Sequence, residues 1–388
     1  MIRREPRGFV FVVGAIGFLA WGIAAALTGC SDDDQEAVDD GVSIVMDAHR
    51  AVVVNSLSSA MSVLDIEVPP RVTDHFGDIV LGTSANLVGV WGNEVFVVNS
   101  GTFGSAEDAS IQVVDLESAS LVRTIPLPDG DSPWAMAFLS DDKAYVTNLY
   151  TDSVTILDPQ EDGPSAILGR IELPSGTAPE GIVVHEGRAF TANTGLDFNT
   201  FVYGAGSVSV IDAASDTVVD ADGDPTNGVD TPVYLTGTNP QDLGADAEGN
   251  LWVVCTGDWT SVFGELDVVD TATLALEDSV EIGGSPGSIA VGSHVALIGD
   301  GTGARLFAAD LMTRTMIHDA SNPIVLSTTE WSFVPDIVFD RLGQVAYALA
   351  FMDDRIYEMI YLDNRVQLQN QYSLEGGSGP AGIGLVYE

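Results

Sequence analysis

Prolines recur at regular intervals along this 388-residue chain. Aromatic or polar residues stand one or two positions after four of them: Trp134, Glu180, Gln241, Asp242 and Asp336. If the fold brings them to one opening, the three carboxylates among them could hold Ca²⁺, which prefers hard oxygen ligands. A metal bound there could polarise the carbonyl of a lactone. The simpler interpretation is that these acids face solvent, as most carboxylates of so acidic a chain must.

A second candidate is the acidic insertion "VDADGDPTNGVDTPV", in which acids alternate and are followed by two more oxygen donors. Its candidate ligands are Asp220, Asp222, Asp224, Asn227 and Asp230. Acids at every second position of a tight turn can point at one ion, and the start of the segment resembles an EF-hand calcium loop. It departs from that loop at Pro225, where the sharp-turn glycine belongs, and at Thr231, where the bidentate glutamate belongs. We therefore expect either a weak extracellular Ca²⁺ site or a plain acidic loop.

Other catalytic signatures are missing from the sequence. The five histidines have neither an i, i+4 spacing nor a Cys-x-x-Cys-His context, which argues against copper clusters and c-type haem. No G-x-S-x-G or phosphate-binding loop occurs. Cys255 lies in the apolar run "LWVVCTG" and is expected to be a small buried hydrophobe. The sequence favours a protein that is not an enzyme and requires no cofactor, with Ca²⁺ as the one candidate ion.

The recurring prolines belong to a repeat that organises most of the chain. Its template, "SPWAMAFLSDDKAYVTNLYTDSVTILDPQEDGPSAILGRIELP", reads as four short strands separated by turns. Similar units begin at Val42, Ala85, Ser132, Ala178, Asn239, Ser285 and Val334. The opening prolines are about 45 to 61 residues apart, which is the period of a four-stranded propeller blade. This spacing predicts an all-β, seven-bladed β-propeller over residues 42–388.

Two details of the repeat predict how the blades are built. The third strand of most units ends in an aspartate that can accept bonds from the backbone of the following turn, at Asp65, Asp115, Asp158, Asp212, Asp270 and Asp310. The C-terminal "GSGPAGIGLVYE" opens a unit that does not continue, so we expect it to pair near Val52–Asn55 and close the ring. Whether Val42–Met46 or Ile383–Val386 is the innermost strand of that blade is left open.

The second strands carry a further signature, whose final asparagine, Asn148 in the template unit, is expected to be a turn residue. "AYVTN" at Ala144–Asn148 recurs as "VFVVN" and "AFTAN", and this resembles the YVTN family of β-propeller repeats over essentially residues 42–388. The resemblance implies a seven-bladed, extracytoplasmic protein. The family includes surface-layer and adhesion proteins, relatives of sugar-lactone hydrolases, and the propellers of quinoprotein and copper enzymes. Fold does not choose among these functions.

The N-terminus reads as an export signal. Arginines precede an apolar run from Phe9 to Leu27, and Leu27-Thr28-Gly29-Cys30 resembles the bacterial lipobox, in which the cysteine is acylated. We interpret residues 1–29 as a lipoprotein signal peptide, Cys30 as the lipidation site and residues 30–41 as an acidic tether. Ser31 after the cysteine implies an outer-membrane destination. A transmembrane anchor is the alternative, because the apolar run is long enough to span a bilayer.

The charge balance limits the partners. The chain has 14 Lys and Arg against 57 Asp and Glu, a formal net charge of −43. Such a surface repels phosphate backbones, so nucleic acid is not an expected partner. We expect a monomeric propeller held to the membrane by its lipid, with a protein or small-ligand partner. The favoured function is a binding scaffold at the cell envelope; the alternatives are a lactonase-like metal-dependent hydrolase and an accessory subunit of a periplasmic redox enzyme.

Overall fold

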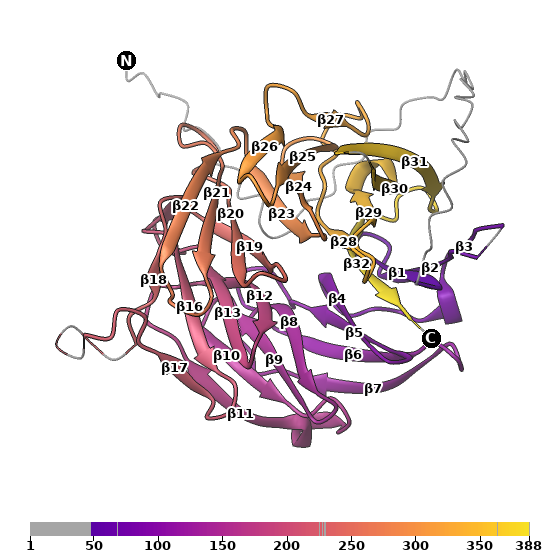
Figure 1. Ribbon diagram of the computed structural model, residues 1–388. Coiled ribbons are helices and arrows are strands. Elements are labelled where there is room, and N and C mark those ends of the chain that lie inside the picture. Colours follow the sequence, from indigo (N-terminus) through magenta and orange to yellow (C-terminus); the bar gives the residue numbers. More distant parts are fainter. Residues whose placement is uncertain are drawn as a thin grey trace, which may run out of the picture. The chain divides into compact units, whose positions relative to one another are not determined.

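Seven four-stranded antiparallel sheets arranged around a central axis form the fold in a computed structural model of the chain (Figure 1). The structure describes residues 48–67, 69–224, 226, 228, 230–362 and 364–387. All of these fall in one compact unit, Ile44–Glu388. The signal peptide, Cys30, the tether and Val42–Met46 lie outside the described residues.

The first three blades contain twelve strands, named here from the inside of each blade outward. Blade 1 comprises β32 (Pro380–Val386), β1 (Arg50–Asn55), β2 (Ala60–Asp65) and β3 (Arg71–Thr73). Blade 2 comprises β4 (Ala85–Trp91), β5 (Glu94–Asn99), β6 (Ser110–Asp115) and β7 (Ser120–Pro126). Blade 3 comprises β8 (Pro133–Ser140), β9 (Lys143–Asn148), β10 (Ser153–Leu157) and β11 (Ile167–Glu172).

The other four blades repeat this order with small additions. Blade 4 comprises β12 (Pro179–His185), β13 (Arg188–Asn193), β16 (Ser207–Asp212) and β17 (Thr217–Val219), with β18 (Val233–Tyr234) also on β16. Blade 5 comprises β19 (Pro240–Ala245), β20 (Asn250–Cys255), β21 (Glu265–Asp270) and β22 (Leu276–Glu281). Blade 6 comprises β23 (Pro286–Val291), β24 (Val295–Asp300), β25 (Arg305–Asp310) and β26 (Thr315–His318), with β27 (Ile324–Val325) also on β25. Blade 7 comprises β28 (Ile337–Phe339), β29 (Val345–Ala350), β30 (Arg355–Leu362) and β31 (Arg365–Ser373).

Short elements lie in the connections. A separate hairpin, β14 (Leu196–Asp197) with β15 (Val202–Tyr203), stands between β13 and β16. Three 3₁₀ turns, η1 (Phe76–Asp78), η2 (Gly163–Ala166) and η3 (Phe351–Asp353), are the helices among the described residues, and none has the length and hydrophobicity needed to cross a bilayer.

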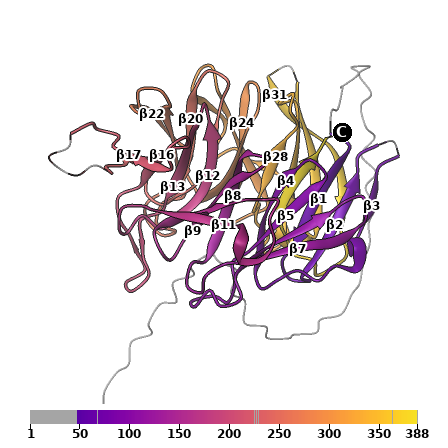
Figure 2. The same ribbon diagram turned by 90° about the horizontal axis from the view of Figure 1, so that it is seen from below.

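The ring closes through the two ends of the chain, which confirms the predicted pairing. β32 runs antiparallel to β1, with Ile383 opposite Val53 and Val386 opposite Arg50. β32 is therefore the innermost strand of blade 1, which decides the order left open by the sequence. The seven inner strands contact one another in a closed circle, in the order β4, β8, β12, β19, β23, β28, β32. Figure 2 shows these sheets from the side.

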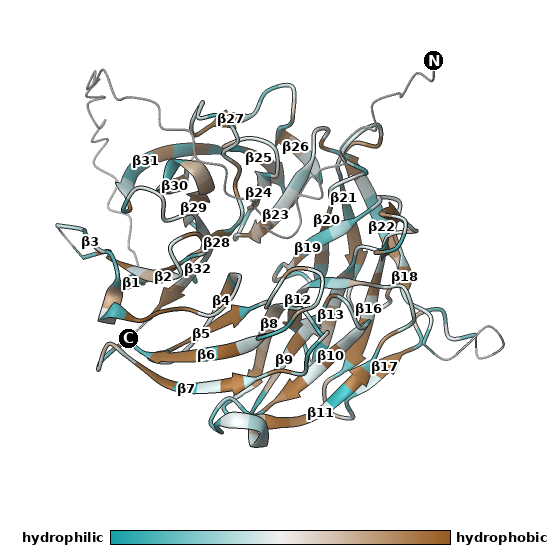
Figure 3. Cartoon of the chain, turned by 180° about the vertical axis from the view of Figure 1, so that it is seen from behind, coloured by the Kyte–Doolittle hydropathy of each residue, from teal (hydrophilic) through white to brown (hydrophobic). Residues whose placement is uncertain are grey.

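Apolar contacts between blades supply the core. Seven buried clusters each join two consecutive blades; Phe96 and Val113 of blade 2, for example, pack with Val146 and Leu157 of blade 3. The remaining blade pairs are joined in the same way. Hydrophobic residues accordingly follow the strands in Figure 3, while the connections are more hydrophilic. Each blade buries both faces only because a neighbour lies on either side, as expected for a closed propeller.

The repeated aspartates act in turns, as predicted, in five of six units. Asp310, for example, accepts from the backbone N–H groups of Met312 (2.9 Å) and Thr313 (2.8 Å). Equivalent bonds are made by Asp115, Asp158, Asp212 and Asp270. Asp65 differs, because it accepts from Arg50 Nε at 3.1 Å instead.

The asparagine of the YVTN signature lies inside the blade, where a turn position was expected. Asn148 is fully buried, and its Nδ2 donates to Ser153 Oγ (3.0 Å) and Thr155 Oγ1 (2.9 Å) of the third strand. Asn193 makes the same pair of bonds in blade 4. The residue therefore ties the second strand to the third, and its recurrence has a structural cause.

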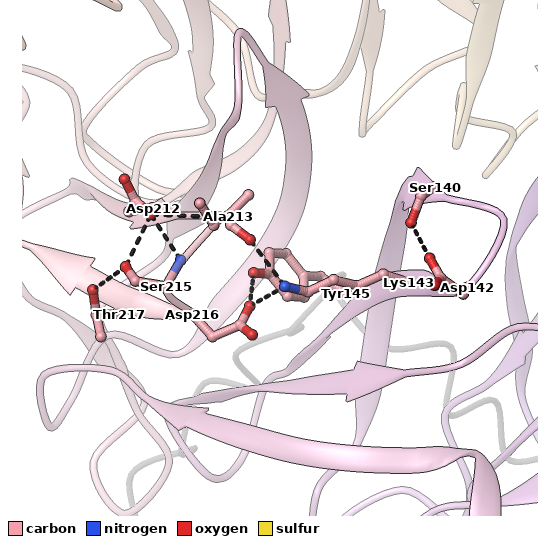
Figure 4. A network of polar contacts seen from close by, with 10 residues as sticks. Ser140, Asp142, Lys143, Tyr145, Asp212, Ala213, Ser215, Asp216 and Thr217 are labelled. Atoms are coloured by element: carbon pink, nitrogen blue, oxygen red, sulfur yellow. Dashed lines mark hydrogen bonds and ion pairs between the residues drawn. The ribbon is translucent and has the colours of Figure 1, made fainter.

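A polar contact also joins blades 3 and 4 (Figure 4). Lys143, the single lysine of the chain, begins β9 and donates from Nζ to the Ala213 carbonyl oxygen at 2.9 Å. Its Nζ also lies 2.6 Å from the Asp216 carboxylate, which accepts a hydrogen bond from the Tyr145 hydroxyl as well. Both bonded groups of blade 4 belong to the turn after β16, so Lys143 links the second strand of one blade to the outer turn of the next.

Candidate functional site

The inner strands share an irregularity just after their opening residue. The register with the second strand shifts between Pro133 and Met136 in β8, between Pro179 and Ile182 in β12, and between Pro240 and Asp242 in β19. Such bulges change the direction in which a side chain points. Trp134, Glu180 and Gln241 occupy the shifted positions of three consecutive inner strands, so the predicted residues are neighbours at one end of the channel.

Glu180 is the most unusual of these side chains. Only 4% of it is exposed, and its carboxyl makes no hydrogen bond or ion pair among the described residues. Burial, and then the charge of Asp242, raise the pKa of Glu180 well above its ordinary value. Its surroundings therefore favour the protonated form of the carboxyl.

Asp242 and Asp336 have a structural role that the sequence does not reveal. Asp242 accepts from the backbone N–H of Leu243 (2.8 Å) and from that of Ile289 (2.9 Å) on the next inner strand. Asp336 does the same with Ile337 and Ile383, both at 2.8 Å. Each carboxylate thus bonds one inner strand to the next around the channel.

These two acids also titrate unusually. Burial raises the pKa of Asp242 to about 6 and that of Asp336 to about 8, although the backbone hydrogen bonds act in the opposite direction. The charge of Asp242 contributes to the shifts of both Glu180 and Asp336. The three predicted carboxylates therefore lie close enough to influence one another. Within the described residues, however, no group of three or more His, Cys, Asp and Glu side chains could hold a metal ion.

The acidic insertion lies in the connection between β17 and β18, which extends outward in Figures 1 and 2. Its carboxylates bond within the loop: Asp222 accepts from Asp224 N (2.8 Å), and Asp224 accepts from Thr226 N (2.9 Å) and Oγ1 (2.7 Å). Asn227 lies outside the described residues. Calcium binding by Asp220, Asp222, Asp224, Asn227 and Asp230 stays a prediction.

Sequence reasoning missed a chain of aromatic contacts above the channel end. It runs through the connections between second and third strands, which we call the loop face: residues 56–59, 100–109, 149–152, 194–206, 256–264, 301–304 and 351–354. In antiparallel blades these connections and the starts of the inner strands lie at the same end. The signal was an aromatic residue a few positions after the second strand of blades 3, 4 and 5.

Individual contacts join these loops from blade to blade. Tyr150 Oη accepts from Gly104 N at 3.2 Å, and its ring meets that of Phe198 edge-on with centroids 4.7 Å apart. Trp259 Nε1 donates to Tyr203 Oη at 3.1 Å. The ring of Trp259 also lies against Gly301, where an added Cβ would come within 3.0 Å of it. Five consecutive blades, from 2 to 6, are thereby connected at this end.

Large apolar side chains are exposed on the same loops. They are Leu57, Phe103, Phe201, Val202, Val262, Phe263 and Met352. Phe201 is 48% exposed and Phe263 is 60% exposed. At the opposite end, the ends and turns of the described blades carry Trp91, Met312 and Leu342. The loop face is therefore the more apolar end, although the chain as a whole is strongly acidic.

Comparisons with known proteins give the fold and no family. No family model matches the chain, and no curated protein matches its sequence. A functionally unknown protein from Desulfotomaculum acetoxidans is similar in structure, with a TM-score of 0.60 and 12% identity over 88% of this chain and 99% of that one. A streptogramin B lyase structure has a TM-score of 0.57 and 11% identity, covering 79% and 91% of the two chains. Hydrazine synthase from Kuenenia stuttgartiensis has a TM-score of 0.52 and 16% identity, covering 85% and 97%. At these identities the similarities establish a β-propeller fold alone.

Proposed function

We propose that this chain is a YVTN-type β-propeller, anchored by lipid at Cys30 in the outer membrane, that acts as a binding scaffold outside the cytoplasm. The N-terminal lipobox pattern and the acidic tether support the anchor. The recurring "YVTN" signature supports the repeat family.

The observation that carries the binding role is the gathering of exposed apolar side chains on the loop face. Phe103, Phe201 and Phe263 stand on loops of three different blades, and large exposed apolar groups at one end of a soluble domain mark an interaction surface. The aromatic contacts beneath them hold neighbouring loops together, so the surface is ordered before a partner arrives and loses little entropy on binding. We infer that the partner is a protein with an apolar patch and a neutral or cationic rim, because a net charge of −43 repels acidic surfaces.

Affinity capture from envelope extract tests this function with matched variants of the full chain. The double variant Phe201→Ser, Phe263→Ser removes two apolar anchors from the loop face, and Met312→Ser removes an 83% exposed side chain from the opposite end. We expect one specific partner to be retained by the wild type and by Met312→Ser and to be lost from the double variant. The capture is repeated with a calcium chelator. A partner that is still retained binds without calcium, whereas a partner that is lost depends on calcium at the acidic insertion. Equal retention by all three proteins, or no specific partner in either condition, contradicts the proposal.

A further inference from the structure

The region around Glu180 contains polar atoms that nothing in the described structure satisfies. The Glu180 side chain is only 4% exposed, and its carboxyl has no hydrogen bond or ion pair among the described residues. Asn239, which is fully buried just before β19, has an unpaired Oδ1, and its Nδ2 donates to the Gly257 carbonyl oxygen at 3.2 Å. Because Nδ2 is the atom that donates to Gly257, the unpaired atom of the amide is the oxygen, which is a hydrogen-bond acceptor. The buried Thr256 Oγ1 is unpaired as well.

Contacts place these groups in one neighbourhood. Thr256 N donates to the Asn239 carbonyl oxygen at 2.9 Å, so the two residues are adjacent. The pKa of Tyr203 is raised to about 12, first by burial and also by the charge of Glu180, while Trp259 and Asn239 act in the opposite direction. The charge of Asp242, which lies on the next inner strand, contributes to the raised pKa of Glu180. Tyr203 therefore lies near both Glu180 and Asn239.

Aromatic rings line the same region. Trp134 occupies the bulge of the inner strand next to that of Glu180, and it packs in a cluster with Tyr203, Leu149 and Leu196. Trp259 donates its indole N–H to the Tyr203 hydroxyl. The faces of such rings attract cations, most strongly where water is excluded.

Among the residues that the structure describes, no side chain donates to Glu180 or to Asn239 Oδ1. None of the ion pairs between described residues involves Glu180, Asp242 or Asp336. The surroundings are rich in acceptors, and the chain as a whole carries a net charge of −43, which raises the local concentration of cations. A ligand that matches these surroundings is a cation with several N–H donors and an apolar body.

We propose that Glu180 and Asn239, next to the rings of Trp134 and Tyr203, form a binding site for a primary alkylammonium group at the loop-face end of the channel. An –NH₃⁺ group has three donors and no acceptor. It can bond to the Glu180 carboxylate and to Asn239 Oδ1, while its alkyl chain lies against the rings. A quaternary ammonium would satisfy the rings but not the acceptors, and Ca²⁺ would satisfy the acceptors but not the rings. The site does not depend on the lipid anchor or on the protein partner.

Titration calorimetry with n-butylammonium, on the full chain in detergent, tests the site. Glu180→Gln keeps the shape and removes the charge, and Glu186→Gln is the control, because Glu186 is exposed in the turn at the other end of β12. We expect wild type and Glu186→Gln to bind the amine, Glu180→Gln to bind it at least about tenfold more weakly, and tetramethylammonium to bind less tightly than the primary amine. Binding should also be coupled to proton release, because burial and the charge of Asp242 raise the pKa of Glu180, whereas a bound ammonium favours its ionised form.

Three results overturn the proposal: no binding to the wild type, equal binding to Glu180→Gln, or tighter binding of tetramethylammonium or Ca²⁺ than of the primary amine. If Glu180→Gln does not fold, Trp134→Leu replaces it, with the same tenfold loss expected from the missing ring. Proton release is measured on the wild type alone, in two buffers of different ionisation enthalpy. An equal heat in both buffers contradicts the ionisation of Glu180.

Discussion

Replacing Lys143 by methionine tests how much the polar contact between blades 3 and 4 stabilises the propeller. Methionine keeps an apolar stem of similar length, so packing is largely retained while the ammonium is lost. The change removes the Nζ bond to the Ala213 carbonyl oxygen (2.9 Å) and the ion pair with Asp216 (2.6 Å). Asp216 keeps its bond from the Tyr145 hydroxyl.

The magnitude follows from how exposed the groups are. A hydrogen bond from a charged donor is worth about 1.5 to 3 kcal/mol. The side chains of Lys143 and Asp216 are 22% and 32% exposed, so solvent screens their ion pair and it adds only about 0.5 kcal/mol. We expect a loss of about 2 kcal/mol in the free energy of unfolding. With an unfolding entropy of about 2.1 cal/mol/K per residue over roughly 340 residues, the melting temperature falls by about 3 °C.

The assay is thermal unfolding followed by circular dichroism, with Arg365→Met as the matched control. Arg365 begins the exposed strand β31, and its side chain makes no hydrogen bond or ion pair among the described residues. Both variants remove one positive charge from a chain of net charge −43, so both suffer the same added self-repulsion. Equal melting temperatures for the two variants would refute the argument, because the loss would then come from net charge and not from the contact between blades.

Three further predictions concern the carboxylates. Burial raises the pKa of folded Glu180 above that of the unfolded chain, about 4.3. The folded state therefore binds this proton more tightly, and the side chain costs more stability as the pH rises above that value. Glu180→Gln should raise the melting temperature more at pH 8 than at pH 5; an equal gain at both contradicts this. Asp310→Ala removes a carboxylate that accepts two backbone hydrogen bonds in a turn, and it should lower the free energy of unfolding in urea by about 1 kcal/mol. Asp65→Ala removes only a half-exposed ion pair with Arg50 and should lower it by less than half as much. The reverse order contradicts the turn argument. Calcium titration of the full chain should show a weak site, with a dissociation constant of about 10⁻⁴ to 10⁻³ M, that is lost in Asp222→Asn, Asp224→Asn; unchanged binding in that variant places the ion elsewhere.

The sequence predicted the blades because each blade repeats the same local chemistry. Prolines that cannot donate to a sheet begin five of the seven inner strands, and aspartates that accept backbone bonds end most of the third strands or follow them directly. These signals are local, so they can be read without knowing which segments meet. The choice of Ile383–Val386 as the innermost strand of blade 1 could not be read in this way, since two apolar segments competed for one position and the choice depends on a pairing between the ends of the chain.

The candidate site was predicted only in part, for the same reason. The residues after the prolines were identified, but the bonds from Asp242 to Ile289 and from Asp336 to Ile383 join segments 47 residues apart and have no pattern in the sequence. The contacts of Tyr150 with Phe198 and of Trp259 with Tyr203 likewise join separate loops. The prediction for Asn148 was wrong. This residue was interpreted as a turn former, but it is buried and donates hydrogen bonds from the second strand to the third.

The bulges explain why a repeated fold can carry one specific site. A bulge places the residue after the opening position of six inner strands in equivalent geometry at the same end of the channel. The backbone there is repeated, but the side chains are not: Asn86, Trp134, Glu180 and Gln241 follow one another through four blades, whereas Gly287 and Ala381 stand at the corresponding positions of two others. Large polar and aromatic groups therefore occupy one side of the ring and small residues the other. Such an asymmetric opening can orient a ligand that a seven-fold symmetric ring could not.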